Sequence, residues 1–290
     1  MSKNSIIKTL KYFDLHNHPL TLLELQRFLL SDGWAKRPRL DEIFNDLEDL
    51  IGEKVVVEEN GFFALYGRQE LFEKRYRAYP IYFARIFKTA RVVKILRYVP
   101  FVRGIAVSGS LAGMYSNEQS DIDFLVIVRK NRIWLARLFL SAVTQALGVR
   151  RHGENISNRI CLNHYVAEDC ILENDRTTYS AVEYASLLCL FNPAVLDDFL
   201  KKQIWLGNFL VFPPCEVSRS VYTVKPSRIL QPALEFLIDI LGGNFWERLA
   251  RGLQRKRIKT GETVLVSDNE LSFHPGSKGR SFMARFENLG

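Results

Sequence analysis

Two short apolar segments in the middle of the chain, joined by a Gly-Ser pair and an Asp-x-Asp pair, constrain the fold more than any other feature. Residues 104–108 read Gly-Ile-Ala-Val-Ser and predict a buried strand that ends at Gly109-Ser110. A short helix is predicted over 111–115. Residues 120–128 predict a second strand, in which Asp121 and Asp123 precede a β-branched apolar run. The order is therefore strand, tight turn, short helix and strand.

The spacing of the two acids has a chemical consequence. Residues i and i+2 of a strand share a face, so the carboxylates of Asp121 and Asp123 should converge. Two close carboxylates repel unless a cation lies between them, and Mg²⁺ typically binds one or two carboxylates together with substrate phosphates. Gly109 permits close backbone approach, and Ser110 begins a helix, a position suited to phosphate. The alternative is a solvated strand end beside an ordinary turn, but the joint occurrence of both pairs favours a site.

This arrangement resembles the signature of the DNA polymerase β-like nucleotidyltransferase superfamily, in which a Gly-Ser or Gly-Gly pair precedes an Asp-x-Asp/Glu pair. The flanking segments 110–112 and 117–121 are similar to those of small bacterial members, and the helices expected later resemble the kanamycin-type enzymes. The resemblance implies an α+β fold, a mixed sheet with flanking helices. It also implies transfer of a nucleoside monophosphate from an NTP to an acceptor that stays open, with Mg²⁺ as cofactor. Asp121 and Asp123 would be the catalytic metal ligands, and Gly109 and Ser110 would contact the NTP phosphates.

The third acid that members of this superfamily usually carry on a later strand is replaced here. A helix is predicted over 133–147 and a strand over 159–166, where Asn163 takes the place of that acid. An amide oxygen can ligate Mg²⁺ but cannot serve as a base at neutral pH. Alternation sends His164 to the opposite face, which favours a buried, hydrogen-bonded strand histidine, and Glu168 and Asp169 lie at or beyond the strand end. An active transferase and a weak or inactive nucleotide- or partner-binding protein of the same fold both stay open.

Residues 1–70 predict three helices, over 5–13, 21–30 and 40–51, and a hairpin of strands 55–57 and 62–65 around Asn60-Gly61. This order of elements resembles a winged-helix module. The module holds 9 Lys and Arg against 12 Asp and Glu, and acids crowd its third helix and its wing. Phosphate binding needs cations at those surfaces, so we do not expect residues 1–70 to bind duplex DNA. A nucleic-acid-binding regulator is therefore the third and least favoured function.

Two further regions are expected. Residues 71–175 form the nucleotidyltransferase core with a basic helical lead-in over 71–103, broken at Tyr79-Pro80. Residues 176–290 form a C-terminal helical region, with helices over 178–191, 194–210 and 232–257 and a hairpin over 263–273. From residue 71 onward the chain holds 31 Lys and Arg against 20 Asp and Glu, which indicates either an anionic partner or a solvated basic surface. The same two interpretations apply to the basic cluster that ends the 232–257 helix.

The remaining candidates favour structural roles. His16 and His18 are interpreted as loop residues before Thr21, and His274 as a turn residue before Pro275. The four cysteines are too scattered for a zinc site or a disulfide framework, which predicts reduced, mostly buried thiols. The sequence has neither a signal-peptide pattern nor an apolar stretch of spanning length, so we expect a cytoplasmic protein without a membrane partner.

Overall fold

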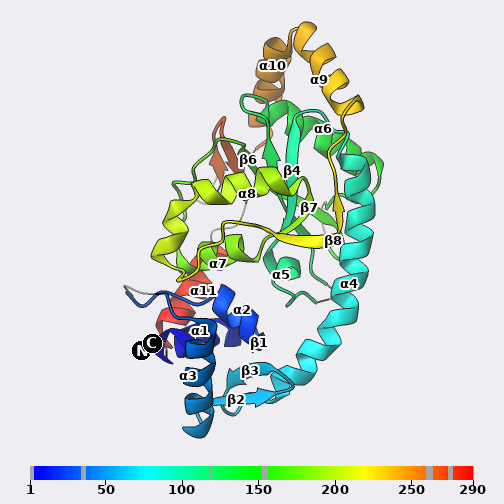
Figure 1. Cartoon of the computed structure of the whole chain (residues 1–290). Coiled ribbons are helices and arrows are strands. Elements are labelled where there is room, and N and C mark those ends of the chain that lie inside the picture. The colour runs from blue at the N-terminus through cyan, green and yellow to red at the C-terminus, as the bar shows by residue number, and fades with distance from the viewer. Residues whose placement is uncertain are drawn as a thin grey trace.

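The protein is an α+β molecule built around a mixed sheet (Figure 1). The computed structural model describes residues 3–33, 37–117, 119–151, 156–258, 264–273 and 277–289, without the side chains of 277 and 278. Within these residues the main sheet has the strand order β8-β7-β4-β5-β6-β10-β9. The pairs β5–β6 and β7–β8 are parallel and the other neighbours are antiparallel.

The central strands lie where the sequence predicts them. They are β4 (Val102–Ser108), β5 (Ile122–Val128) and β6 (Ile160–Ala167), and the late hairpin is β9 (Leu265–Val266) with β10 (Glu270–Ser272). The predicted helix over 178–191 is wrong at its end, because the chain leaves α7 (Thr178–Ser186) and forms β7 (Leu188–Phe191) against β4. Strand β8 (Ser218–Val224) was not predicted. Thr263 of the hairpin, Lys259 of the basic cluster and His274 lie outside the described residues.

Helices cover both faces of the main sheet. Ala106 and Leu125 pack into a core with α7 and α8 (Pro193–Lys202), whereas Ile105 and Phe124 pack with α4 (Glu70–Leu96) and α6 (Ile133–Ala146). This division follows from alternation, since successive side chains of a strand point to opposite faces. Both faces are apolar and buried, which explains why the strands read as nearly continuous hydrophobic runs.

The N-terminal elements follow the predicted order with one exception. They are α1 (Lys3–Asp14), β1 (Leu20–Thr21), α2 (Leu22–Arg27), α3 (Leu40–Gly52), β2 (Val56–Glu59) and β3 (Phe62–Leu65). The short strand β1, which pairs with β3, was not predicted. Thr21 and Glu24 form the expected capping box. The second helix ends at Arg27 rather than near residue 30, because the backbone of Leu29 accepts a hydrogen bond from the N–H of Val211 at 2.9 Å. The turn residues Asn60 and Gly61 both have positive φ, as an Asn-Gly hairpin requires.

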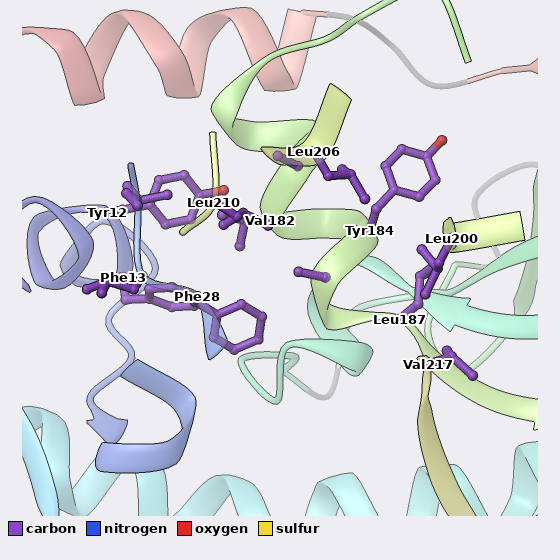
Figure 2. Close-up of a cluster of buried hydrophobic side chains, with 14 of the residues drawn as sticks. Tyr12, Phe13, Phe28, Val182, Tyr184, Leu187, Leu200, Leu206, Leu210 and Val217 are labelled. Carbon is purple, nitrogen blue, oxygen red and sulfur yellow. The ribbon is translucent and has the colours of Figure 1, made fainter. Parts of the chain in front are cut away.

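One apolar cluster joins the first and last parts of the chain (Figure 2). Tyr12, Phe13 and Phe28 pack in the same cluster as side chains from α7, α8 and the 3₁₀ helix η1 (Ile204–Asn208). Phe282 and Phe286 of α11 (Ser277–Glu287) complete it, each in an edge-on contact with Tyr12. The N-terminal elements are therefore packed onto the sheet domain through a shared core.

The expected break at Tyr79-Pro80 is wrong, because α4 continues through Pro80. Proline removes one backbone hydrogen bond and bends a helix without necessarily ending it, and the ribbon of α4 changes direction along its length (Figure 1). Buried guanidinium groups hold the helix on both sides of the proline. Arg75 donates to Glu24 of α2 at 2.5 Å, and Arg85 donates to the carbonyl of Asn117 at 2.9 Å.

The predicted helix over 232–257 is two helices, α9 (Leu230–Ile240) and α10 (Gly243–Arg255). Gly242 separates them with a φ of +90°, a left-handed conformation that glycine adopts without strain. None of the helices in the described part of the chain combines the length and apolar composition that crossing a bilayer requires.

We predict that Glu24→Gln lowers the free energy of unfolding by about 3 kcal/mol, because it leaves the buried guanidinium of Arg75 without its counter-charge. The matched control is Glu73→Gln, which breaks the exposed pair with Arg77 and should cost less than about 0.5 kcal/mol. Urea denaturation of both variants measures the difference, and equal losses would contradict the role given to Arg75.

Candidate active site

The two predicted acids lie where β5 begins, at one end of the central strands of the sheet. Asp123 pairs in register with Ser108 at the end of β4 and with Cys161 near the start of β6. One ligand atom from each of Asp121, Asp123 and Cys161 lies within 4.8 Å of the other two. The carboxylates therefore converge as their spacing predicts, and a thiol joins them from the neighbouring strand.

Gly109 lies directly beneath the Asp123 carboxylate. Its φ is +63°, and a Cβ atom at this position would be 2.9 Å from Asp123 Oδ2. Only glycine fits this contact without displacing the acid. Ser110 follows in the single turn α5 (Gly109–Ala112), whose first N–H groups have no partner within the helix. The Gly-Ser pair and the Asp-x-Asp pair, separate in sequence, thus meet in space.

The loop before β5 is held by α4. The guanidinium of Arg85 is buried and donates to the backbone carbonyls of Asn117, Ser120 and Asp121, the last at 3.2 Å. The Ser120 hydroxyl also donates to Asn117 Oδ1 at 2.9 Å, which closes the loop on itself. These contacts fix the backbone of Asp121, so the position of this acid depends on the long basic helix.

Asn163 lies against the acid pair. Its side chain is 7% exposed, and Nδ2 donates to Asp123 Oδ1 at 2.7 Å. The amide therefore presents a proton donor to the carboxylate where a third acid would present an acceptor. A hydrogen bond to the charged form of a carboxylate favours that form.

The expectation that alternation separates His164 from Asn163 is wrong. The register of β5 with β6 shifts between Asp123–Cys161 and Leu125–His164, so β6 carries one extra residue there. This bulge lets His164 face α7, where its ring contacts Tyr184 and Nε2 lies 3.1 Å from Glu270. His164 is buried and hydrogen-bonded as expected, but on the side of the sheet that carries the acids.

Two residues of the site escaped the sequence analysis. Arg151 donates to the Asp121 carboxylate and lies 3.7 Å from Cys161 Sγ. Burial, reinforced by Asp123 and Asp121, raises the pKa of Cys161 to about 12, so the thiol stays protonated at neutral pH. Cys161 could have been found, because it stands two residues before Asn163 on the same strand. Arg151 carried no such signal, since it lies between the predicted helix over 133–147 and the predicted strand over 159–166.

Aromatic side chains connect the segment after α5 with the N-terminal elements. Tyr115 follows α5, and its ring stacks on His16 at 4.4 Å between centroids. His16 also stacks on Phe282 of α11 at the same distance. Burial, and secondarily Arg285, lowers the pKa of His16 to about 4, so the ring is neutral at pH 7. The two early histidines lie in the turn region expected, but as packed groups: His18 is buried beside Arg75.

Comparison of the chain with protein-family models, with curated proteins and with solved structures found no match.

We predict that Gly109→Ala lowers the free energy of unfolding by about 1–3 kcal/mol, because alanine strains the left-handed backbone and pushes on Asp123. Gly61→Ala is the control: Gly61 has a φ of +81° but nothing within 4 Å of the added Cβ, so it carries the backbone cost alone. The excess cost at Gly109 measures the contact with Asp123. Equal costs in urea denaturation would mean that this contact does not constrain residue 109.

Proposed function

We propose that this protein is a nucleotidyltransferase that moves a nucleoside monophosphate from an NTP to an acceptor with the help of Mg²⁺. The observation that carries the proposal is the meeting of Gly109 with the carboxylate of Asp123, beside Asp121 on the same strand face. Phosphate-binding turns and metal-binding carboxylates must be adjacent in such a site, because the metal and the turn hold the same triphosphate.

The donor atoms suit a hard cation. Carboxylate oxygens are the protein ligands that Mg²⁺ prefers, and Asp121 and Asp123 would hold it. Cys161 adds little, since a soft sulfur atom is a poor ligand for the hard cation Mg²⁺. Arg151 supplies positive charge at Asp121, and its side chain is 40% exposed, which makes it a candidate contact for the triphosphate.

The proposed reaction is an in-line displacement at the α-phosphorus. The acceptor oxygen forms a bond to this atom, the bond to the β-phosphate oxygen breaks, and pyrophosphate leaves. Bound Mg²⁺ would polarise the α-phosphate and stabilise the charge on pyrophosphate. Gly109 and Ser110 would hold the β- and γ-phosphates through backbone N–H groups and the hydroxyl, and Arg85 keeps Asp121 in place by holding its loop.

A second candidate function is nucleotide or partner binding with little turnover, and the contact of Asn163 with Asp123 favours it. The amide cannot accept the proton of the acceptor hydroxyl, and loss of a general base typically costs about 10²–10⁴-fold in rate. Slow transfer, or transfer to an acceptor that is already deprotonated such as a phosphate, is consistent with this site. The proposal of a regulator that binds duplex DNA through residues 1–70 gains no support.

We predict that Asp121→Asn with Asp123→Asn abolishes the Mg²⁺-dependent part of the affinity for a non-hydrolysable NTP. The two charges that attract the cation are then gone, although the side-chain shapes are kept. Calorimetric titration with and without Mg²⁺ measures this, and pyrophosphate release tests turnover. Asp169→Asn is the control, because this acid lies past the end of β6 and pairs with Lys130. Undiminished Mg²⁺-dependent binding by the double variant would refute the proposed site.

We predict that Asn163→Asp lowers the free energy of unfolding in EDTA by about 1–3 kcal/mol, because a donor to Asp123 becomes a repelling carboxylate. Added Mg²⁺ should restore more stability to this variant than to the wild type. Asn163→Ala removes the hydrogen bond without adding charge, so it should respond to Mg²⁺ no more than the wild type does. If Asn163→Asp and Asn163→Ala respond alike, a third carboxylate at this position does not reach the metal.

A further inference from the structure

The helical pair α9–α10 projects from the end of the molecule (Figure 1). Both helices carry exposed apolar side chains. We define the α9–α10 apolar face by six residues whose side chains are all more than half exposed: Phe236, Leu237, Ile240, Leu241, Phe245 and Leu253. Folded proteins rarely leave large contiguous apolar surfaces in water unless these surfaces contact a partner. The face therefore requires an occupant.

The acids of this region all point inward. Glu235 accepts from Arg103 at 2.7 Å, and Asp239 accepts from Arg129 at 2.7 Å. Glu247 accepts from the backbone N–H groups of Trp134 and Leu135, at 2.8 and 3.0 Å. These are the only acids between residues 225 and 258. The hairpin is thus attached to the sheet domain through its negative charges, and none of them is directed toward the apolar face.

The exposed charges of the same region are all positive. They are carried by Lys225, Arg228, Arg248, Arg255, Lys256 and Arg257. Trp246, next to Phe245 where α10 begins, is also exposed. Apolar and aromatic side chains on one side of a helix, bordered by lysine and arginine, are typical of helices that lie in the interface of a bilayer. A helix that lies in the plane of the membrane surface does not have to be long enough to cross the bilayer.

We propose that the α9–α10 apolar face binds the surface of an anionic lipid bilayer, which replaces the expectation of no membrane partner. Charge complementarity selects this occupant over a second copy of the chain, because two copies joined through this face would bring two sets of uncompensated cations together. Anionic headgroups instead supply the opposite charge, while the acyl region receives the apolar side chains. The proposal does not depend on the nucleotidyltransferase function, since it uses none of the residues of the candidate active site.

The test is cosedimentation of the full chain with vesicles of phosphatidylcholine, with or without phosphatidylglycerol. We expect binding to the anionic vesicles, weakened by salt, and much less to the neutral ones. The variant Phe236→Ser/Phe245→Ser/Leu253→Ser should reduce the partition coefficient at least about tenfold. Its control, Leu23→Ser/Ile204→Ser/Val221→Ser, removes three exposed apolar side chains elsewhere and should bind as the wild type does. All six positions are exposed, so folding is not at risk, and thermal melts verify this.

The charge requirement has its own variant. Arg248→Gln with Lys256→Gln should weaken binding to anionic vesicles by about fivefold for each charge, whereas Lys88→Gln with Arg91→Gln on α4 should not. The proposal is overturned if the wild type does not sediment with anionic vesicles at low salt, if it binds neutral vesicles equally well, or if the apolar-face variant binds unchanged. A dimer that this variant dissociates, without vesicle binding, would assign the face to a second copy instead.

Discussion

The pairing of β4 with β5 determines where the candidate active site lies. Because Ser108 stands opposite Asp123, the turn that follows β4 must pass beside the acids that begin β5. The parallel pairing of β5 with β6 then brings Cys161 and Asn163 to the same end of the strands as the two acids. Moving β5 by one residue relative to β4 would turn Asp121 and Asp123 to the other face of the sheet, toward the core that α4 and α6 form with it. The chemistry of the site is thus a consequence of strand register, which the apolar pattern of both faces enforces.

Helix α4 contacts both the N-terminal elements and the loop that precedes β5. Its two buried guanidinium groups make different kinds of contact: Arg75 pairs with a carboxylate of α2, while Arg85 satisfies backbone carbonyls of the loop before β5. Each would be costly to bury without its partners. The same helix therefore fixes both the N-terminal elements and the position of Asp121.

The sequence correctly predicted the features that depend on residues close together in the chain. The Asn-Gly hairpin, the capping box at Thr21 and the strands around Gly109 depend on neighbouring residues, and each occurs where expected. Apart from the division of the 232–257 helix at Gly242, the errors come from tertiary contacts. Residues 188–191 have the apolar spacing of a helix end, but they form a strand because they pair with β4. Pro80 predicts a break, but α4 continues through it because buried arginines hold the helix on both sides of the proline. The bulge that turns His164 toward α7 leaves no trace in an apolar strand pattern, and Arg151 reaches Asp121 only through the fold.

Asn163 decides how the acids behave when no cation is bound. A third carboxylate at that place would add repulsion to a pair that is already close, and the folded chain would then depend on metal for part of its stability. The amide removes that dependence, since its Nδ2 donates a hydrogen bond to Asp123 at 2.7 Å. Asn163 is not the base, because a side-chain amide does not take up a proton at neutral pH. If the site performs the proposed transfer, Asn163 exchanges catalytic power for stability without metal. On that proposal, the site keeps its shape before the cation binds.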